Sequence, residues 1–355
     1  MAEFRTRGHP AALAVVRRAI VSDRPPHALL LVGPAQVGKT TLALDLASGL
    51  LCLADSSADR PCRTCVACRK VEHANHPDLH LVAPDGAGGQ IRLAQAQGLI
   101  AALALLPLEG RFRVAIVEQA QRLNPDAQNA LLKTLEEPPA RVCLILAADE
   151  SGSLLSTLVS RCARLRLGPV FPDALAGILA EQAGLDAAQS AVLARTTGGR
   201  PGAALALARQ PDVLVARARL ARTLLALLPA SRRQRLAAVP GLLDDGAALA
   251  GPPARRTASA ARAPAERRAA LAQLLAVWRD VARDLAVAVH GGRDALRQPD
   301  LLDELDRVAG AIAPAGLASF LVRLDDMERA LESYANPELM LDGLLLAWPH
   351  AASAS

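Results

Sequence analysis

The sequence predicts an α/β nucleotide-binding module followed by helical domains. A glycine-rich loop, Gly33 to Thr40, joins a short apolar segment to a helical pattern. Apolar segments then alternate with amphipathic ones as far as residue 167, and the strand pattern stops after Gly168. Such alternation is typical of a parallel sheet with helices on both faces.

Each element of this module follows from a local pattern. We expect strands where short apolar runs are bounded by turn residues, at residues 29–32, 79–82, 113–117, 142–147 and 165–167. We expect helices where apolar residues recur at helical spacing, at residues 10–22, 40–51, 91–105 and 126–137. The last helix ends before Pro138-Pro139, because proline cannot continue a helix.

The remainder of the chain is predicted to be helical. Residues 172–208 give three short helices, interrupted at Gly184 and at the glycine-rich turn 198–202. Helical patterns continue from residue 211 to the end, apart from a stretch rich in Pro, Ala and Arg at 251–268. We expect that stretch to be a flexible loop.

Length and composition limit the class of protein. With 355 residues, 52% of them hydrophobic, the chain has room for two or three domains with sizeable cores. No run approaches the ~18 apolar residues of a membrane span, and the N-terminus lacks the layout of a signal peptide. We therefore expect a cytoplasmic protein with reduced cysteines. The net charge is +5, but only 2% of residues are aromatic, which disfavours a base-stacking platform for nucleic acid.

The glycine-rich loop has the spacing G-x-x-x-x-G-K-T of a phosphate-binding loop. Gly33 and Gly38 allow backbone N–H groups to surround phosphate oxygens at the start of the next helix. Lys39 would reach the β- and γ-phosphates, and the Thr40 hydroxyl would bind Mg²⁺, with Thr41 beside it. Lys39 is one of only three lysines in the chain. The motif predicts a site for ATP or ADP with Mg²⁺.

Four cysteines follow this loop with the spacing C-x9-C-x2-C-x2-C: Cys52, Cys62, Cys65 and Cys68. In a reducing compartment such a cluster indicates a metal site rather than disulfides. Four thiolates can surround Zn²⁺ tetrahedrally and leave no open position, so the predicted site is structural. Three histidines follow closely and could replace a cysteine as ligand: His73, His76 and His80.

Two other positions are candidates for chemistry. Glu118 directly follows the strand at 113–117 and could belong to the Mg²⁺ shell, or it could merely end the strand. The next residue, Gln119, cannot act as a base because its amide is neutral. Arg161 precedes the last strand and could stabilise charge on a neighbouring subunit's γ-phosphate. Alternatively, it is an ordinary solvated or ion-paired arginine.

Together these residues resemble the delta-prime subunits of the bacterial DNA polymerase III clamp loader, in the AAA+ family. The resemblance covers about residues 8–205. It rests on five features: His27-Ala28 ahead of the phosphate-binding loop, the cysteine insert, His76-Pro77-Asp78-Leu79, Asn129 to Pro139, and Ser160-Arg161-Cys162. It implies three domains: an AAA+ module at 1–168 with a zinc insert at 52–68, a helical lid at 169–209, and a helical collar for oligomerisation at 210–355.

The resemblance also implies a function. Such a subunit joins gamma/tau and delta subunits in a hetero-pentamer, which opens the sliding clamp and places it on primed DNA. It is part of DNA polymerase III without being the polymerase, and Arg161 would be its arginine finger in trans. Gln119, Asp149 and Gly202 depart from the pattern of motor subunits. We therefore expect a stator that binds nucleotide and hydrolyses it weakly or not at all.

Three other functions share some of these sequence features. The first is an ATP-hydrolysing gamma/tau-type motor subunit of the same loader, which shares the cysteine insert and the Ser-Arg-Cys motif. A small-molecule kinase would not need so long a helical tail. A zinc-dependent DNA-binding module would place a basic helix beside the cysteines, and the sequence has none there.

Overall fold

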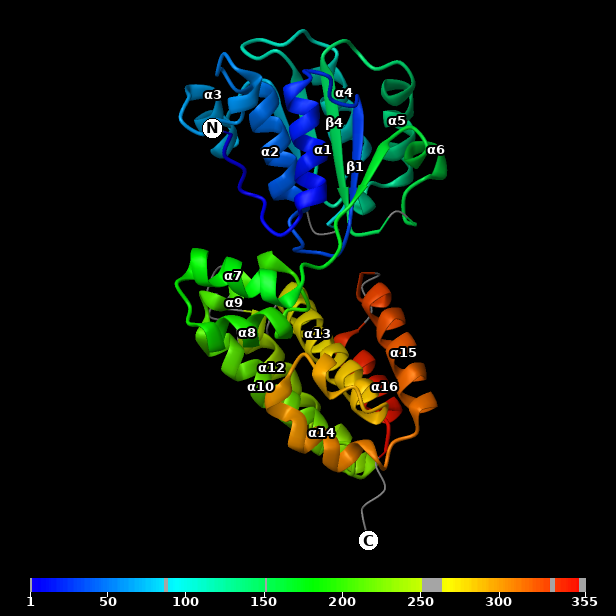
Figure 1. Cartoon of the computed structure of the whole chain (residues 1–355). Coiled ribbons are helices and arrows are strands. Elements are labelled where there is room, and N and C mark those ends of the chain that lie inside the picture. Colours follow the sequence, from blue (N-terminus) through cyan, green and yellow to red (C-terminus); the bar gives the residue numbers. More distant parts are fainter. Residues whose placement is uncertain (1, 86–88, 151, 251–263, 333–335, 351–355) are drawn as a thin grey trace, which may run out of the picture. The chain divides into compact units, whose positions relative to one another are not determined.

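The computed structural model describes residues 2–85, 89–150, 152–250, 264–332 and 336–350 (Figure 1). The chain forms two compact units, one of residues 1–184 with 198–204, the other of residues 185–197 with 205–355. The lid expected at 169–209 is therefore divided between the two units. Its existence as a separate domain stays a prediction.

The first unit contains the predicted parallel sheet. Its strands are β1 (Ala28–Val32), β2 (Leu79–Val82), β3 (Arg113–Val117), β4 (Val142–Ala148) and β5 (Ala163–Arg166). They lie in the order β2-β3-β4-β1-β5, and every neighbouring pair is parallel. Because β1 lies between β4 and β5, the loop after β1 leaves the sheet next to the ends of both strands.

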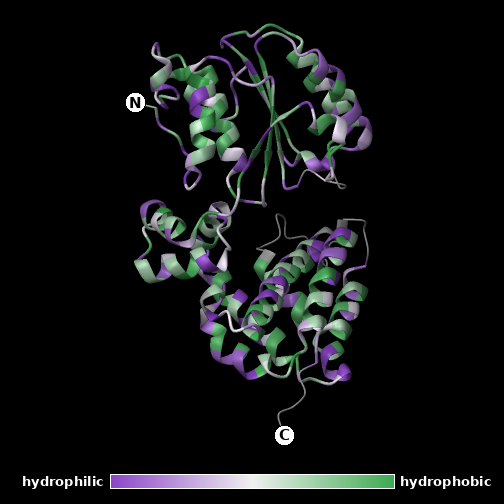
Figure 2. Ribbon diagram, turned by 45° about the vertical axis from the view of Figure 1, so that its right-hand side comes forward, coloured by the Kyte–Doolittle hydropathy of each residue, from purple (hydrophilic) through white to green (hydrophobic). Residues whose placement is uncertain are grey.

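Helices cover both faces of the sheet, as expected. The helices α1 (Pro10–Val21) and α2 (Lys39–Leu51) pack on one face, where Leu29 and Leu31 of β1 point. The helices α4 (Leu93–Leu103) and α5 (Pro125–Glu136) pack on the other face, against Ala28 and Leu30. Figure 2 shows the central strands β1, β3 and β4 as largely hydrophobic, and they are buried almost throughout, which is typical of a sheet covered on both faces.

Several boundaries differ from the sequence prediction. The strand expected at 165–167 begins earlier, because Ala163 already pairs with Leu29 of β1. The helix expected at 91–105 is shorter at both ends. Short helices absent from the prediction are η1 (Ser57–Asp59) and α3 (Val66–Glu72) within the cysteine insert, and η2 (Ala120–Arg122). The helix expected to end at Ser160-Arg161-Cys162 is α6 (Ser156–Val159). Helices of one or two turns give too short a period for the sequence to reveal.

The remaining elements are helical, as predicted. The first unit includes α7 (Pro172–Ala183), and α9 (Pro201–Ala208) begins in it and ends in the second unit. The second unit contains α8 (Ala187–Thr196), α10 (Pro211–Ala226), α11 (Arg232–Ala237), α12 (Val239–Ala250), α13 (Pro264–Val289), η3 (Arg293–Ala295), η4 (Pro299–Leu301), α14 (Leu302–Ala309), α15 (Pro314–Glu332) and α16 (Pro337–Ala347).

An aromatic cluster lies at the core of the second unit. The rings of Trp278 and Trp348 meet edge to face at 5.5 Å between centroids, and Phe320 lies 4.6 Å from Trp348. Of the loop expected at 251–268, residues 251–263 lie outside the described residues, and Pro264 already begins α13. Within the described ranges no single helix is long and apolar enough to cross a membrane.

Candidate nucleotide and metal sites

The phosphate-binding loop connects β1 to α2 in the first unit, as its sequence predicts. Gly38 is the N-cap of α2 with φ +112°, a conformation that side chains rarely adopt. Gly33 lies so close to β5 that a Cβ atom there would come within 2.1 Å of the Leu167 carbonyl oxygen. No side chain caps the start of α2, so the first N–H groups of this helix are available to an anion.

Lys39 is buried within this loop and makes three hydrogen bonds. Its ammonium group donates to the carbonyl oxygens of Gly33 (2.6 Å) and Pro34 (2.8 Å) and to Oδ1 of Asp149 (2.7 Å). An ammonium group has three N–H donors, so these acceptors use all of them. Phosphate oxygens would have to replace some of these acceptors, and the nearest anionic competitor is Asp149.

Asp149 also bonds to Gln121 in a reciprocal pair, which the sequence did not indicate. Gln121 Nε2 donates to Asp149 Oδ2 at 3.0 Å, and the Asp149 backbone N–H donates to Gln121 Oε1 at 3.2 Å. Glu118 follows β3, where its backbone N–H donates to the Val82 carbonyl at 2.8 Å. Gln119 adopts a left-handed conformation with φ +50°. The acid that meets Lys39 is Asp149, whereas the role of Glu118 in a Mg²⁺ shell stays a prediction.

Two carbonyl groups of the loop are held from outside it. His9 Nε2 lies 2.9 Å from the Val37 carbonyl oxygen and must donate, because a carbonyl can only accept. The Gly202 N–H donates to the Gln36 carbonyl at 2.9 Å. A Cβ atom on Gly202 would itself lie 2.9 Å from this oxygen, so the backbone fits here only as glycine. An arginine at this position would disturb the loop.

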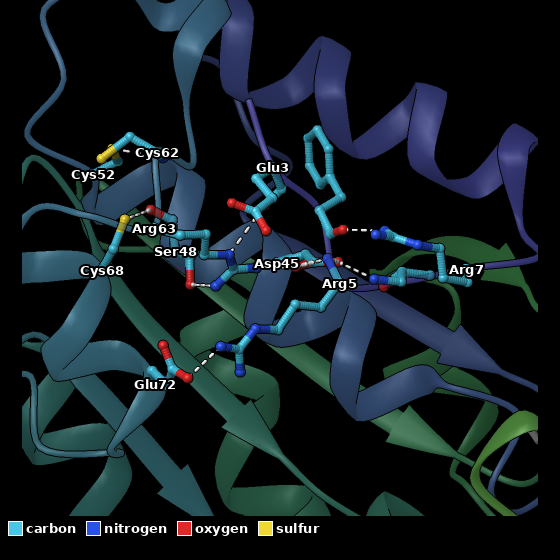
Figure 3. Close-up of polar contacts among 12 residues, drawn as sticks. Glu3, Arg5, Arg7, Asp45, Ser48, Cys52, Cys62, Arg63, Cys68 and Glu72 are labelled. Atoms are coloured by element: carbon cyan, nitrogen blue, oxygen red, sulfur yellow. Dashed lines mark hydrogen bonds and ion pairs between the residues drawn. The ribbon is translucent and has the colours of Figure 1, made fainter. Parts of the chain in front are cut away.

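The four cysteines form a cluster suited to a metal ion. Their Sγ atoms all lie within 4.8 Å of one another, and those of Cys52 and Cys62 are 3.5 Å apart. Zn–S bonds of about 2.3 Å in a tetrahedron separate the sulfur atoms by about 3.8 Å, so the residues fit Zn²⁺. Figure 3 shows Cys52, Cys62 and Cys68 beside the N-terminal part of the chain.

The local structure explains how the cysteines converge. Cys52 ends α2, and Cys65 is the N-cap of α3, where its Sγ accepts from the Cys68 N–H at 3.4 Å. Burial raises the pKa of Cys62, but hydrogen bonds, led by that of the Thr64 hydroxyl, outweigh burial and lower it to about 6. These hydrogen bonds therefore favour the thiolate form of Cys62, which is the form that binds a metal ion.

Two of the three nearby histidines have other partners in the structure. His76 Nδ1 accepts the Asp78 N–H at 3.1 Å, and His80 Nε2 lies 3.2 Å from Arg113 Nη1. Among the described residues the cluster that could hold a metal consists of cysteines alone.

Arg161 lies on an exposed turn between α6 and β5. Its Nη1 donates to the Thr157 carbonyl and its Nη2 to Glu136 Oε1, each at 2.7 Å. Glu136 is the last residue of α5. Both groups are partly exposed, at 34% and 50% of the side chain, so the ion pair is worth little and can be exchanged for another partner.

Known proteins resemble this chain mainly over its first unit. Residues 8–171 match the model of the family described as "DNA polymerase III, delta subunit". Delta-prime of DNA polymerase III from Bacillus subtilis is 37% identical over 173 residues, which are 49% of this chain and 51% of that protein. Delta-prime from Pseudomonas aeruginosa is 38% identical over 136 residues, 38% of this chain and 41% of that one.

Subunits of a second kind also match. The tau subunit of DNA polymerase III from Salmonella typhimurium is 34% identical over 160 residues, 45% of this chain and 24% of that protein. A crystal structure of a gamma subunit-related protein from Thermotoga maritima is 17% identical, covers 94% of this chain and 97% of that chain, and has a TM-score of 0.47. The chain spans about half the length of the delta-prime relatives. The sequence matches confirm the resemblance to delta-prime subunits.

Proposed function

We propose that this chain, a clamp-loader relative of the delta-prime, gamma and tau subunits of DNA polymerase III, acts as the delta-prime stator of its loader. In this function it joins gamma/tau and delta subunits in a hetero-pentamer in the cytoplasm. The assembly opens the sliding clamp and loads it onto primed DNA, which this subunit meets indirectly. The chain contributes Arg161 to the ATP site of the adjacent subunit.

The arrangement around Lys39 supports a subunit that binds nucleotide but hydrolyses it weakly. The phosphates and Mg²⁺ would be held by the residues of the phosphate-binding loop and the start of α2: Gly33, Gly38, Lys39, Thr40 and Thr41. Mg²⁺, when bound, would neutralise part of the phosphate charge. Hydrolysis also needs a base to orient water. Gln119 cannot supply it, because its amide is neutral and its backbone turns away from strand geometry at φ +50°.

The single observation that carries the proposal is the tight contact between Gly202 and the phosphate-binding loop. An ATP-sensing arginine at this position would need a Cβ atom 2.9 Å from the Gln36 carbonyl oxygen. The first unit therefore provides a phosphate cradle but excludes, by packing, a side chain that motor subunits are expected to use.

Arg161 is suited to a role in trans because its guanidinium is accessible and weakly held. Its partners are one carbonyl oxygen and one half-exposed carboxylate. A triphosphate on an adjacent subunit would offer a denser negative charge, and an arginine can bind phosphate oxygens in a bidentate manner.

The test replaces Arg161 with alanine in the reconstituted loader. We expect DNA-stimulated ATP hydrolysis to fall by about 10³-fold, because an arginine finger in trans stabilises transition-state charge. Size-exclusion chromatography should give an unchanged assembly. Arg164→Ala is the matched control, since Arg164 is an exposed arginine on the adjoining strand β5. Undiminished hydrolysis in Arg161→Ala would refute the finger role.

An ATP-hydrolysing motor subunit is the second candidate, favoured by the intact phosphate-binding loop and by the 34% identity to tau. The rate of ATP hydrolysis by the isolated chain separates the two. A stator has a rate close to that of a Lys39→Ala variant. A motor subunit would hydrolyse ATP clearly faster than that variant does.

A further inference from the structure

The N-terminal strap, residues 3–9, connects the cysteine cluster to the phosphate-binding loop. At its first end, the Glu3 N–H donates to the Pro61 carbonyl at 2.9 Å, next to Cys62. At its other end, His9 donates to the Val37 carbonyl of the loop at 2.9 Å. Figure 3 shows the strap alongside Arg63 and Asp45.

Asp45 holds the middle of the strap. It lies on α2, less than two turns after Lys39, and is 0% exposed. Its carboxylate accepts the backbone N–H groups of Arg5 (3.0 Å) and Thr6 (2.8 Å) and the guanidinium of Arg63. A buried carboxylate is tolerated only when it is paired and hydrogen-bonded, so the three contacts depend on one another.

Arg63 links this carboxylate to the cysteines. It lies between Cys62 and Cys65, with φ +58°, and its side chain is 9% exposed. Besides Asp45 it donates to Ser48 Oγ of α2 at 2.8 Å and to the Glu3 carbonyl at 3.1 Å. A metal ion bound to the cysteines on either side would fix the backbone from which this arginine extends.

The strap then reaches the phosphate-binding loop at a constrained turn. Gly8 has φ +79°, and a Cβ atom on it would lie 2.7 Å from the Val170 methyl groups. The next residue, His9, is buried and begins α1 as its N-cap. A strap fixed at Asp45 therefore delivers His9 to Val37 in one orientation.

We propose that Asp45 and Arg63 are positioning residues that transmit metal occupancy of the four cysteines to the phosphate-binding loop through the strap. This inference rests on the nucleotide binding proposed above. With metal bound, Arg63 neutralises Asp45, the strap stays docked, and His9 holds the loop open for phosphate. Without metal, Arg63 loses its fixed backbone, Asp45 loses its cation, and the strap detaches from α2.

The experiment compares the full chain with its Asp45→Asn and Arg63→Gln variants. Zinc content is measured by elemental analysis, strap protection by amide hydrogen exchange, and affinity with a fluorescent ADP analogue. We expect both variants to keep their zinc, to exchange the amides of Arg5 and Thr6 faster, and to bind ADP about tenfold more weakly. Removing the metal from the wild type with a chelator should likewise speed the exchange of these two amides and weaken ADP binding.

Glu72→Gln is the matched control. It removes the exposed ion pair between Arg5 and Glu72 but leaves Asp45 intact, so exchange and ADP affinity should both stay as in the wild type. His9→Ala is the second variant, which avoids the buried carboxylate. It should weaken ADP binding while Arg5 and Thr6 stay protected.

Distinct outcomes overturn the two proposals. Faster strap exchange with unchanged ADP affinity, in the variants or in metal-free protein, would refute the link to the loop. Unchanged strap exchange would refute the role of Asp45 and Arg63. If wild-type protein bound no ADP at all, the proposed nucleotide site would fail. The link would then be decided by whether chelation speeds amide exchange of residues 36–38.

Discussion

At the scale of single residues, the ammonium group of Lys39 already makes its hydrogen bonds within the protein. Its three donors are satisfied by two loop carbonyls and by Asp149, which Gln121 holds in place. A nucleotide must therefore compete with a carboxylate for the same ammonium group.

Replacing Asp149 with asparagine should strengthen nucleotide binding. The amide keeps the size of the side chain but not its charge, so it competes less well with phosphate for Lys39. We expect the Kd for ADP to fall about threefold to tenfold, equivalent to roughly 1 kcal/mol, as measured by isothermal titration calorimetry. Glu150→Gln, at the exposed neighbouring position, serves as control. A weaker complex would mean that Asp149 contributes to the site instead of blocking it.

Asp78 is a second residue whose charge the fold requires. It is 0% exposed, and its carboxylate accepts the N–H groups of Leu108 (2.7 Å), Glu109 (2.8 Å) and Gly110 (2.7 Å). Burial raises the pKa of Asp78, but these hydrogen bonds and Arg113 outweigh burial and lower it below its ordinary value of 3.8. The ionised form therefore stabilises the native state.

Asp78→Asn should destabilise the protein in a pH-dependent way. At pH 7 we expect a loss of about 2–4 kcal/mol, because the amide offers one acceptor oxygen to three donors. Since the native pKa is lowered, the wild-type advantage is complete above pH 3.8 and disappears as the pH falls through the native pKa. Urea unfolding of both proteins, between pH 7 and a pH below 3.8, measures this difference in the free energy of unfolding. Asp85→Asn, at an exposed site, should cost almost nothing.

At the scale of elements, short segments position the sites. The insert between α2 and β2 is only one short helix and one 3-10 turn, yet it brings four thiols within 4.8 Å of one another. The turn between α6 and β5 presents Arg161 beside the end of α5. At these positions the backbone conformation depends on side-chain contacts and turns, rather than on a periodic pattern of apolar residues.

Arg235 connects elements of the second unit that are far apart in the sequence. This buried side chain of α11 donates to the carbonyl oxygens of Leu228 (2.7 Å), Leu345 (3.2 Å) and Pro349 (2.9 Å), and also to Trp348. It therefore satisfies carbonyl groups at the C-terminal ends of α10 and α16.

Arg235→Met should destabilise the second unit by about 3 kcal/mol. Methionine fills a similar volume but leaves several buried carbonyl groups without a donor. Thermal unfolding of the full chain should then show the loss of helical signal at a lower temperature. Arg233→Met, at an exposed position on the same helix, should leave the midpoint nearly unchanged. Equal midpoints for the two variants would argue against this role of Arg235.

At the scale of the whole molecule, the two units differ in how they are specified. The first combines a parallel sheet with a phosphate-binding loop, and both have strong sequence signals. The second is a set of helices whose core includes both tryptophans of the chain. The family match ends at residue 171, so the similarity to known relatives concerns mainly the first unit.

The sequence by itself determined the sheet and its helices, the phosphate-binding loop, the four-cysteine cluster and the family resemblance. These depend on periodicity and on motifs of contiguous residues, which read directly from the chain. It did not determine the partners of Lys39, Gly202, His9 and Arg161. Each of these residues meets a group at least 25 positions away, as in the contacts of His9 with Val37 and Lys39 with Asp149. Only the tertiary structure decides such contacts, because hydrogen bonding acts between groups that are near in space, whatever their separation along the chain.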